Sequence, residues 1–170
     1  MWVTQTYLGN VELDANFFVY YLYEEYNPDQ KGLTENLQRH LEDLGEVYGD
    51  KVSLMMPNPR FAGRIESEVR DFPKLWMAVH EMLPGLLLSP VPLIKLKESL
   101  KGCKFIPFKS NDSKFLSSMI RSIRQLADSA IESANVSQAK KLSWLERLFN
   151  AIEIKPGMLG VNIDIKRLAE

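Results

Sequence analysis

The sequence holds few of the residues that most metal and catalytic sites use. Its 170 residues include one cysteine, Cys103, and two histidines, His40 and His80. A single cysteine excludes an internal disulfide, a CxxC redox pair and a zinc site built from several thiolates. Neither histidine has a second histidine four residues away, so the pattern indicates no metal site and no catalytic triad. We therefore expect no metal and no cofactor, and the sequence favours a non-enzymatic protein while leaving enzymatic activity open.

The sequence also lacks a long hydrophobic run. Apolar stretches such as residues 17–23 and 86–88 are much shorter than the about 18 residues that a membrane-spanning helix needs. The N-terminus shows no basic region followed by an apolar one, so a secretory signal is not indicated. Together with a single unpaired cysteine, these features favour a cytoplasmic protein. Cys103 falls in an alternating apolar run, which predicts a buried structural thiol and not a reactive one.

The net charge of −1 conceals an uneven distribution of charge. Residues 1–56 contain ten acidic and three basic residues, while residues 57–170 contain twelve acidic and eighteen basic ones. This asymmetry indicates a dipolar surface, or attraction between the two parts on folding. The densest basic stretch contains lysines and no arginine, which is typical of a solvated face and does not favour nucleic-acid binding. Its lysines are Lys95, Lys97, Lys101, Lys104 and Lys109.

Strand and helix patterns alternate along the chain. Apolar runs rich in β-forming residues predict strands over 16–23, 51–56, 86–88, 103–108 and 161–165. Apolar residues at helical spacing predict helices over 33–47, within 61–83, over 113–135 and over 137–152. Pro73 divides the second of these regions and suits a first-turn position or a kink. Residues 93–101 are compatible with a short helix or with a loop.

Alternating strands and helices indicate an α/β protein. We predict a three-layer α/β/α fold with a mainly parallel sheet of four or five strands and a C-terminal helical pair. Residues 1–135 would form the α/β domain, and residues 136–170 would pack on it or serve in association. Two topologies remain open. If residues 93–101 form a crossover helix, the fourth strand is parallel and the fold is flavodoxin-like; if they form a loop, the third and fourth strands pair antiparallel.

The second topology resembles the thioredoxin-like fold over roughly residues 16–131. The resemblance lies in the order of the elements, with Pro84 just before the third strand, where that family places a cis-proline. It implies a CxxC motif after the first strand, near residues 27–30, where this chain has Asn-Pro-Asp-Gln. A fold of this kind would therefore lack the family's redox chemistry. A cis peptide bond before Pro84 would distinguish it.

Charged and polar residues follow three of the predicted strands. Ligands of parallel α/β sheets bind beyond the carboxyl ends of the strands, and a helix that begins near Arg60 would attract anions. Arginines could hold a phosphate, and a glutamate could act as acid or base or bind a ribose hydroxyl. The residues of this nucleotide-pocket hypothesis are Glu24, Glu25, Asn27, Asn58, Arg60, Arg64 and Ser89. The chain has no GxGxxG, GxxxxGKS/T or GxSxG motif, and the alternative is that these are solvated loop residues.

The C-terminal helices carry a second hypothesis. Residues 137–152 present more apolar surface than a small sheet needs, including Trp144, Leu145, Leu148 and Phe149. Such a surplus is typical of a surface that binds a partner or a second copy, although it could also close an intramolecular hairpin. The alternating segment 161–165 could likewise pair with its own sheet or with another chain.

The leading interpretation is a non-enzymatic intracellular interaction or regulatory domain that self-associates through its C-terminal helices. The first alternative is a nucleotide-binding sensor or hydrolase with a pocket at the carboxyl ends of the strands. The second alternative is a redox-inactive thioredoxin-like adaptor. We expect a protein partner or a second copy as the binding partner, with a nucleotide as the alternative ligand. Neither a membrane nor a nucleic acid is expected.

Overall fold

The computed structural model describes residues 2–3, 15–23, 31–56, 67, 69–97, 100, 102–108, 113–132 and 163–164. Strands and helices alternate in this part of the chain, which confirms the predicted α/β class. In chain order the elements are β1 (Trp2–Val3), β2 (Phe17–Leu22), α1 (Lys31–Tyr48), η2 (Gly49–Lys51), β3 (Val52–Met55), α3 (Pro73–Val79), η4 (His80–Met82), β4 (Gly85–Ser89), η5 (Leu93–Lys97), β5 (Lys104–Pro107), α4 (Ser113–Glu132) and β6 (Ile163–Asp164). The η elements are short 3-10 helices.

The strands form one mixed sheet in the order β1-β3-β2-β4-β5-β6. β1 and β2 both pair with β3 in parallel, whereas β4 runs antiparallel to β2, β5 to β4 and β6 to β5. Most of the described pairings are antiparallel, so the prediction of a mainly parallel sheet is wrong. The chain reverses twice, because β4 enters the sheet antiparallel to β2, and the connection that contains the five-residue η5 then returns β5 antiparallel to β4. The flavodoxin-like alternative required a parallel fourth strand and is excluded by this direction.

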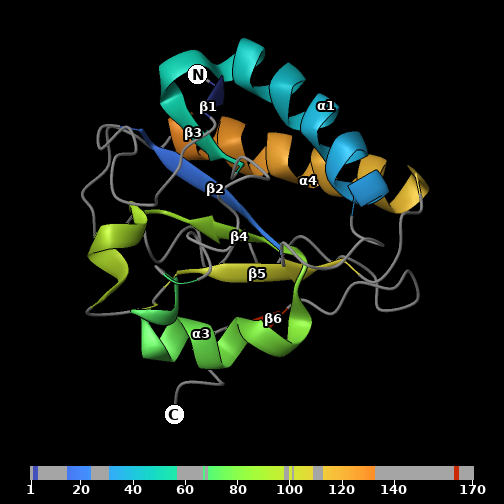
Figure 1. Ribbon diagram of the computed structural model, residues 1–170. Helices are drawn as coiled ribbons and strands as arrows, with labels where there is room; N and C mark the ends of the chain where they lie inside the picture. Colours follow the sequence, from blue (N-terminus) through green and yellow to red (C-terminus); the bar gives the residue numbers. More distant parts are fainter. Residues whose placement is uncertain are drawn as a thin grey trace.

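Helices cover both faces of the sheet, α1 and α4 on one face and α3 on the other (Figure 1). β2 lies near the centre of the sheet, and all six of its residues are buried. Alternate residues from Phe17 pack with α1 and α4, whereas those from Phe18 pack with α3. A strand covered on both faces explains the nearly continuous apolar run that predicted it. We call the two sides of the sheet the α1/α4 face and the α3 face.

Two long amphipathic helices build the α1/α4 face. The helices predicted over 33–47 and 113–135 are confirmed in their described part, as α1 and α4. The apolar residues that predicted them are buried against the sheet. At the end of α1, the Tyr48 hydroxyl lies 2.8 Å from Asp128 Oδ1 and 3.2 Å from the Arg124 carbonyl oxygen of α4. Burial, together with the Asp128 carboxylate, raises the pKa of Tyr48 to about 12. This contact ties the two helices together outside the core.

Shorter elements cover the α3 face. α3 is a helix of seven residues with Pro73 in its first turn, one of the two placements that the sequence predicted. η4 follows α3 directly, and η5 follows β4. Leu75 and Val79 of α3 and Leu93 of η5 are buried in one cluster on this face.

β4 begins directly after Pro84, and the Leu83–Pro84 peptide bond is cis, as the thioredoxin-like alternative expected. The Phe108 N–H donates to the Pro84 carbonyl oxygen at 2.7 Å, which joins the start of β4 to the end of β5. Gly85 leaves no room for a side chain. A Cβ there would overlap the Phe105 ring and lie 2.7 Å from the Ile106 carbonyl oxygen. The backbone of β4 therefore packs directly against β5.

The predicted C-terminal helix over 137–152 lies outside the described residues, and so does most of the predicted region 136–170. The exception is β6, which falls within the predicted strand 161–165 and pairs antiparallel with β5. Among the described helices, none is long and apolar enough to cross a membrane.

Candidate functional site

Most residues of the two binding hypotheses lie outside the described residues. Those of the nucleotide-pocket hypothesis are Glu24, Glu25, Asn27, Asn58, Arg60 and Arg64. Those of the association hypothesis are Trp144, Leu145, Leu148 and Phe149. Of all these candidates, the structure places Ser89, together with the strands that the other loop residues follow.

Ser89 does not share an end of the sheet with the residues that follow β2 and β3. β4 is antiparallel to β2, and its register pairs Ser89 with Phe18 near the start of β2. Residues 24–30 follow the other end of β2, and residue 58 follows the corresponding end of the parallel strand β3. The expectation that the three strand ends lie together assumed parallel strands. The direction of β4 corrects it.

Ser89 lies in a buried polar cluster on the α3 face. Its hydroxyl donates to the Val91 carbonyl oxygen at 2.6 Å and accepts from the Val91 N–H at 3.2 Å. The Cys103 thiol donates to the same hydroxyl at 3.5 Å, and the Leu93 N–H donates to the Tyr20 hydroxyl at 2.9 Å. These hydroxyls thus satisfy backbone groups of the turn after β4. We call Tyr20, Ser89 and Cys103 the Ser89 cluster.

Burial keeps the Ser89 cluster neutral. It raises the pKa of the Cys103 thiol from an ordinary value of 9.0 to about 12, against the opposing effect of the hydrogen bond with Ser89. Burial also raises the pKa of the Tyr20 hydroxyl well above 10.0, against the opposing effect of the Leu93 N–H. A thiol that stays protonated is a poor nucleophile and a poor metal ligand. The predicted burial of Cys103 is confirmed, and its contacts support a structural role for the cluster.

The outer side of α3 carries an aromatic and apolar surface. Met77 is 75% exposed, and Trp76 beside it is partly buried. The guanidinium carbon of Arg70 lies 4.8 Å from the centroid of the Trp76 ring, within the range of a cation–π contact. The His80 imidazole stacks on the same ring, with the two centroids 5.3 Å apart. We call Arg70, Trp76, Met77 and His80 the Trp76 surface.

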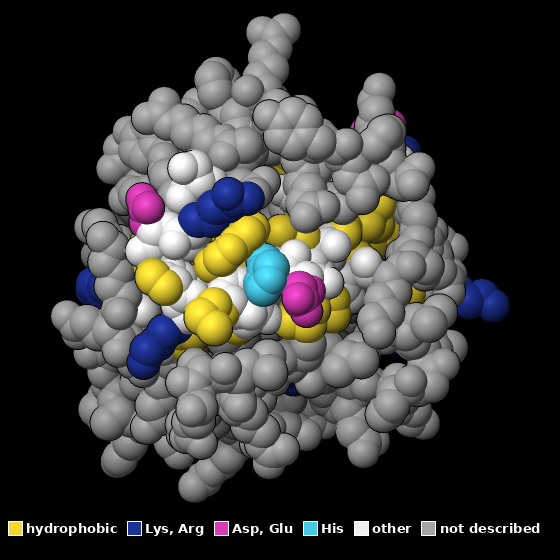
Figure 2. Space-filling model, turned by 60° about the horizontal axis from the view of Figure 1, so that its bottom comes forward, with side chains coloured by type: hydrophobic (Ala, Val, Ile, Leu, Met, Phe, Trp, Pro, Cys, Tyr) yellow, Lys and Arg dark blue, Asp and Glu magenta, His cyan; other side chains and the backbone are white. Residues whose placement is uncertain are grey.

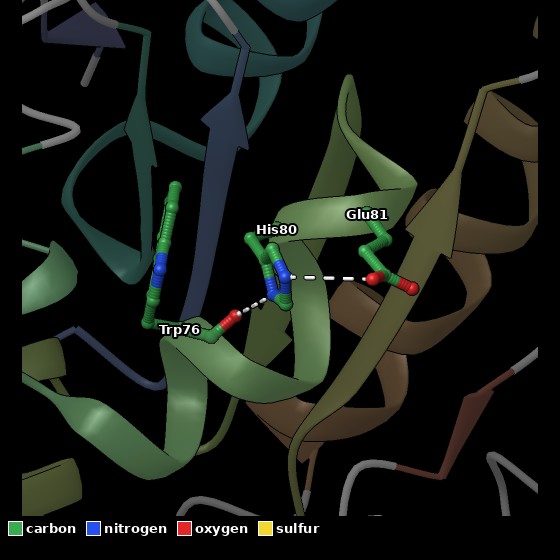
Figure 3. Close-up of polar contacts among 3 residues, drawn as sticks. All are labelled: Trp76, His80 and Glu81. Carbon is green, nitrogen blue, oxygen red and sulfur yellow. Dashed lines mark hydrogen bonds and ion pairs between the residues drawn. The ribbon is translucent and has the colours of Figure 1, made fainter.

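Figure 2 shows hydrophobic side chains gathered with a histidine and with basic side chains on this side of the molecule. Both ring nitrogens of His80 have partners (Figure 3). Nδ1 lies 3.0 Å from the Trp76 carbonyl oxygen, and Nε2 lies 3.7 Å from Glu81 Oε1. Since a carbonyl oxygen only accepts, Nδ1 carries a proton in this contact. The partly buried structural role predicted for His80 agrees with these contacts. The described part of the chain holds no group of three or more His, Cys, Asp or Glu residues placed to bind a metal.

The sequence patterns did not indicate the Trp76 surface as a candidate for binding. The four-residue spacing of Trp76 and His80 could have indicated their stacking, because residues i and i+4 of a helix are neighbours. The contact of Arg70 with Trp76 had no such signal. Pro73 starts α3 between these two residues, so helical spacing does not relate them.

A third feature lies at the end of β2, before residues 24–30. The Tyr21 hydroxyl and Thr34 Oγ1 are 3.0 Å apart, which links β2 to the first turn of α1. The Tyr21 ring stacks on Tyr23 and contacts Phe108, with centroid distances of 5.0 and 6.0 Å. Burial raises the pKa of Tyr21 to about 12. The end of β2 and the start of α1 are thus joined on either side of residues 24–30.

Comparison with protein-family models, with curated proteins and with solved structures finds no match to this chain.

Proposed function

We propose that this chain is a non-enzymatic intracellular interaction domain with a thioredoxin-like fold and no redox centre, and that it self-associates through its C-terminal residues. The arrangement of the strands is the observation that supports this proposal best. A parallel half, β1-β3-β2, adjoins an antiparallel half, β4-β5, with α1 after β2 and α4 after β5. The thioredoxin-like alternative required this antiparallel pairing of β4 with β5.

The residues that would give such a fold redox activity are missing from the expected place. The CxxC motif of the family would follow β2, and residues 27–30 read Asn-Pro-Asp-Gln. The single thiol, Cys103, lies on the α3 face just before β5, buried and with its pKa raised to about 12. A buried, protonated thiol is unsuited to thiol–disulfide exchange. A scaffold without these reactive groups is suited to binding.

Installing the missing motif tests the assignment of the fold. In a Cys103→Ala background, Asn27→Cys with Gln30→Cys places two thiols at the family's spacing before α1. We expect this variant to catalyse the reduction of insulin by dithiothreitol at least about tenfold faster than the natural chain. The matched control, Ser118→Cys with Arg121→Cys, puts the same spacing on the exposed side of α4 and should bring no gain. Equal rates for the two double variants would contradict the thioredoxin-like assignment.

Sedimentation velocity of the full chain over a range of concentrations tests the self-association. We expect a dimer or a larger oligomer that Leu148→Asp with Phe149→Asp converts to monomer, because a buried apolar contact does not tolerate an unpaired charge. Val47→Asp with Met77→Asp is the control. It adds the same two charges at exposed apolar positions of α1 and α3 and should leave the oligomer intact. A natural chain that stays monomeric at every concentration would contradict this part of the proposal.

A further inference from the structure

The sulfur-containing side chains of this protein differ sharply in their access to solvent. Thiols and thioethers are the side chains that hydroperoxides oxidise most readily, and the fold protects those that it covers. Met55, Met56 and Met119 are only 1 or 2% exposed, and Met82 packs against the apolar cluster of the α3 face. Met77 is 75% exposed. Among the methionines that the structure describes, it is therefore the one whose side chain is largely open to solvent.

The thiol of Cys103 is withdrawn from reaction with an oxidant in solution. The thiolate attacks a peroxide much faster than the thiol, so a reactive cysteine needs a low pKa and access to solvent. Cys103 is 4% exposed, and burial raises its pKa to about 12. Its thiol also donates to the Ser89 hydroxyl inside the fold. The oxidant therefore meets the Met77 thioether before it meets the single cysteine of the chain.

Met77 lies on the outer side of α3, within the Trp76 surface. Residues three positions apart on a helix are neighbours, so Lys74 and His80 flank Met77 on this side. Lys74 is exposed and His80 is half-buried. The opposite side of the helix carries the buried residues Leu75, Ala78 and Val79. A chemical change at Met77 therefore alters the outer surface of α3 and leaves the packing of the core in place.

We propose that Met77 is the methionine at which hydroperoxides first oxidise the described part of this chain, and that its oxidation makes the Trp76 surface more polar without unfolding the protein. The sulfur lone pair attacks the terminal oxygen of the hydroperoxide, and the O–O bond breaks. The departing oxygen takes the proton of the attacked hydroxyl. The thioether becomes a sulfoxide, oxidised by two electrons, and the hydroperoxide is reduced to water or an alcohol. This modification is independent of the self-association proposed above.

The same reaction has a different consequence inside the fold. Met119 and Met55 belong to the apolar clusters of the two faces of the sheet. A polar sulfoxide without a hydrogen-bond partner in either cluster would destabilise the fold. At Met77 the added oxygen meets water. We therefore expect a chain oxidised at Met77 alone to unfold at nearly the same temperature as the reduced chain.

Peptide mapping by mass spectrometry tests the site of oxidation. The folded full chain is treated with hydrogen peroxide, the reaction is stopped with catalase at successive times, and fragmentation assigns each added oxygen to one methionine. We expect Met77 to be oxidised at least about tenfold faster than Met55, Met56 and Met119. In concentrated guanidinium chloride the same residues should react at similar rates, because the fold alone protects the buried ones.

Two results of this mapping would overturn the proposal. The first is oxidation of Met77 and Met119 at equal rates in the folded chain. The second is loss of the Cys103 thiol before Met77 is oxidised, measured as the thiol that iodoacetamide alkylates after unfolding. Met1 and Met158 lie outside the described residues and do not enter the comparison.

Met77→Leu, with Met119→Leu as the matched control, tests the effect on the surface. Leucine keeps the apolar side chain at nearly the same volume and removes the sulfur. After peroxide treatment, the natural chain should elute earlier from a hydrophobic-interaction column. Met77→Leu should reduce this shift, and Met119→Leu should leave it unchanged. Equal shifts for the natural chain and Met77→Leu would overturn the change in polarity.

Thermal unfolding of the same samples tests whether the fold survives. We expect the unfolding temperature of the chain oxidised at Met77 to stay within about 2 °C of that of the reduced chain. A fall of more than about 5 °C that Met77→Leu prevents would show that the fold depends on the reduced thioether, and would overturn this part of the proposal.

Discussion

The two faces of the sheet are covered in different ways. On the α1/α4 face, helices of 18 and 20 residues lie over a large apolar cluster. On the α3 face, a helix of seven residues and two short 3-10 helices cover a cluster that includes Cys103. The buried hydroxyls of Ser53 and Ser89 belong to this second face. Each serine lies two positions along its strand from a residue of the α3 cluster, and side chains two positions apart point to the same face.

This difference bears on how the stability of the fold is divided between the two faces. Burial of apolar surface is the main stabilising contribution to a fold, and the long stripes of α1 and α4 provide more of it. The α3 face combines a hydroxyl network inside with the exposed Met77 outside. We infer that the α1/α4 face holds most of the stability of the fold.

Truncation of one leucine on each face should give the largest effects. Leu41 of α1 and Leu75 of α3 are both fully buried. We expect Leu41→Ala to lower the free energy of unfolding by about 3–5 kcal/mol and Leu75→Ala by about 2–3 kcal/mol. The short α3 can shift into the cavity more easily than the 18-residue α1. Urea unfolding followed by circular dichroism measures both losses, and a larger loss for Leu75→Ala would contradict the comparison.

The close approach of β4 and β5 on the α3 face should give the next largest effect. Gly85→Ala adds a methyl group where the Phe105 ring lies, and we expect a loss of about 1–3 kcal/mol. Gly49→Ala is the control. Nothing lies within 4 Å of a Cβ at Gly49, so its expected cost of about 1–2 kcal/mol comes from the backbone angle φ of +57°. Phe105→Leu should reduce the cost of Gly85→Ala and leave that of Gly49→Ala unchanged, as measured by a double-mutant cycle.

As the pH rises, buried groups on the α3 face should begin to lower the free energy of unfolding at a lower pH than those on the α1/α4 face. The pKa of Cys103 is about 12 in the folded chain and 9.0 ordinarily, so the unfolded chain loses this proton first and stability falls above pH 9. At pH 10 the loss from Cys103 amounts to about 1.4 kcal/mol. Tyr21, on the other face, has an ordinary pKa of 10.0 and contributes to the fall only above that pH.

The pH dependence is checked by urea unfolding between pH 8 and 11. Cys103→Ala should reduce the decrease in the free energy of unfolding between pH 9 and 10. Tyr21→Phe should reduce this decrease only at higher pH. If the slope between pH 9 and 10 is the same with and without the thiol, the raised pKa of Cys103 is wrong.

The two buried serines of the α3 face should respond in opposite directions, with the smallest effects of the series. The Ser89 hydroxyl bonds to both backbone groups of Val91, whereas Ser53 Oγ has no hydrogen-bond partner among the described residues. We expect Ser89→Ala to lower the free energy of unfolding by about 1 kcal/mol. Ser53→Ala should leave it unchanged or raise it by up to about 1 kcal/mol. Thermal unfolding compares the two, and equal losses would mean that Ser53 has a partner in solution.

The sequence predicted the described elements well but not their directions. Leu33, Leu37 and Leu41 of α1 had to face one side to be buried, so their spacing revealed the helix. The strand at 103–108 was also visible from its alternation. The direction of this strand relative to β4 could not be read from the sequence, because the apolar residues of 93–101 suit a 3-10 turn as well as a crossover helix. Local periodicity does not encode which way the chain returns.

The contacts within the candidate sites were harder to predict than the burial of their members. Cys103 was expected to be buried from its own surroundings in the sequence. Its hydrogen bond with Ser89 depends on the antiparallel pairing of β4 with β5, which sets Leu88 opposite Lys104 and brings the two residues together. Arg70 reaches Trp76 through the turn before α3, which no spacing rule describes.

β2 is paired on both sides with strands that are distant from it in the sequence. Twenty-nine residues separate β2 from β3 and sixty-two separate it from β4, whereas fourteen separate β4 from β5. Closing the shortest loop costs the least chain entropy, so the β4–β5 hairpin is the pair that can form first during folding. Until β2 inserts, the β1-β3 part and the β4-β5 part share no strand, and each presents an open edge. The place of β2 between these two parts therefore covers two strand edges that would otherwise be open to pairing with another chain.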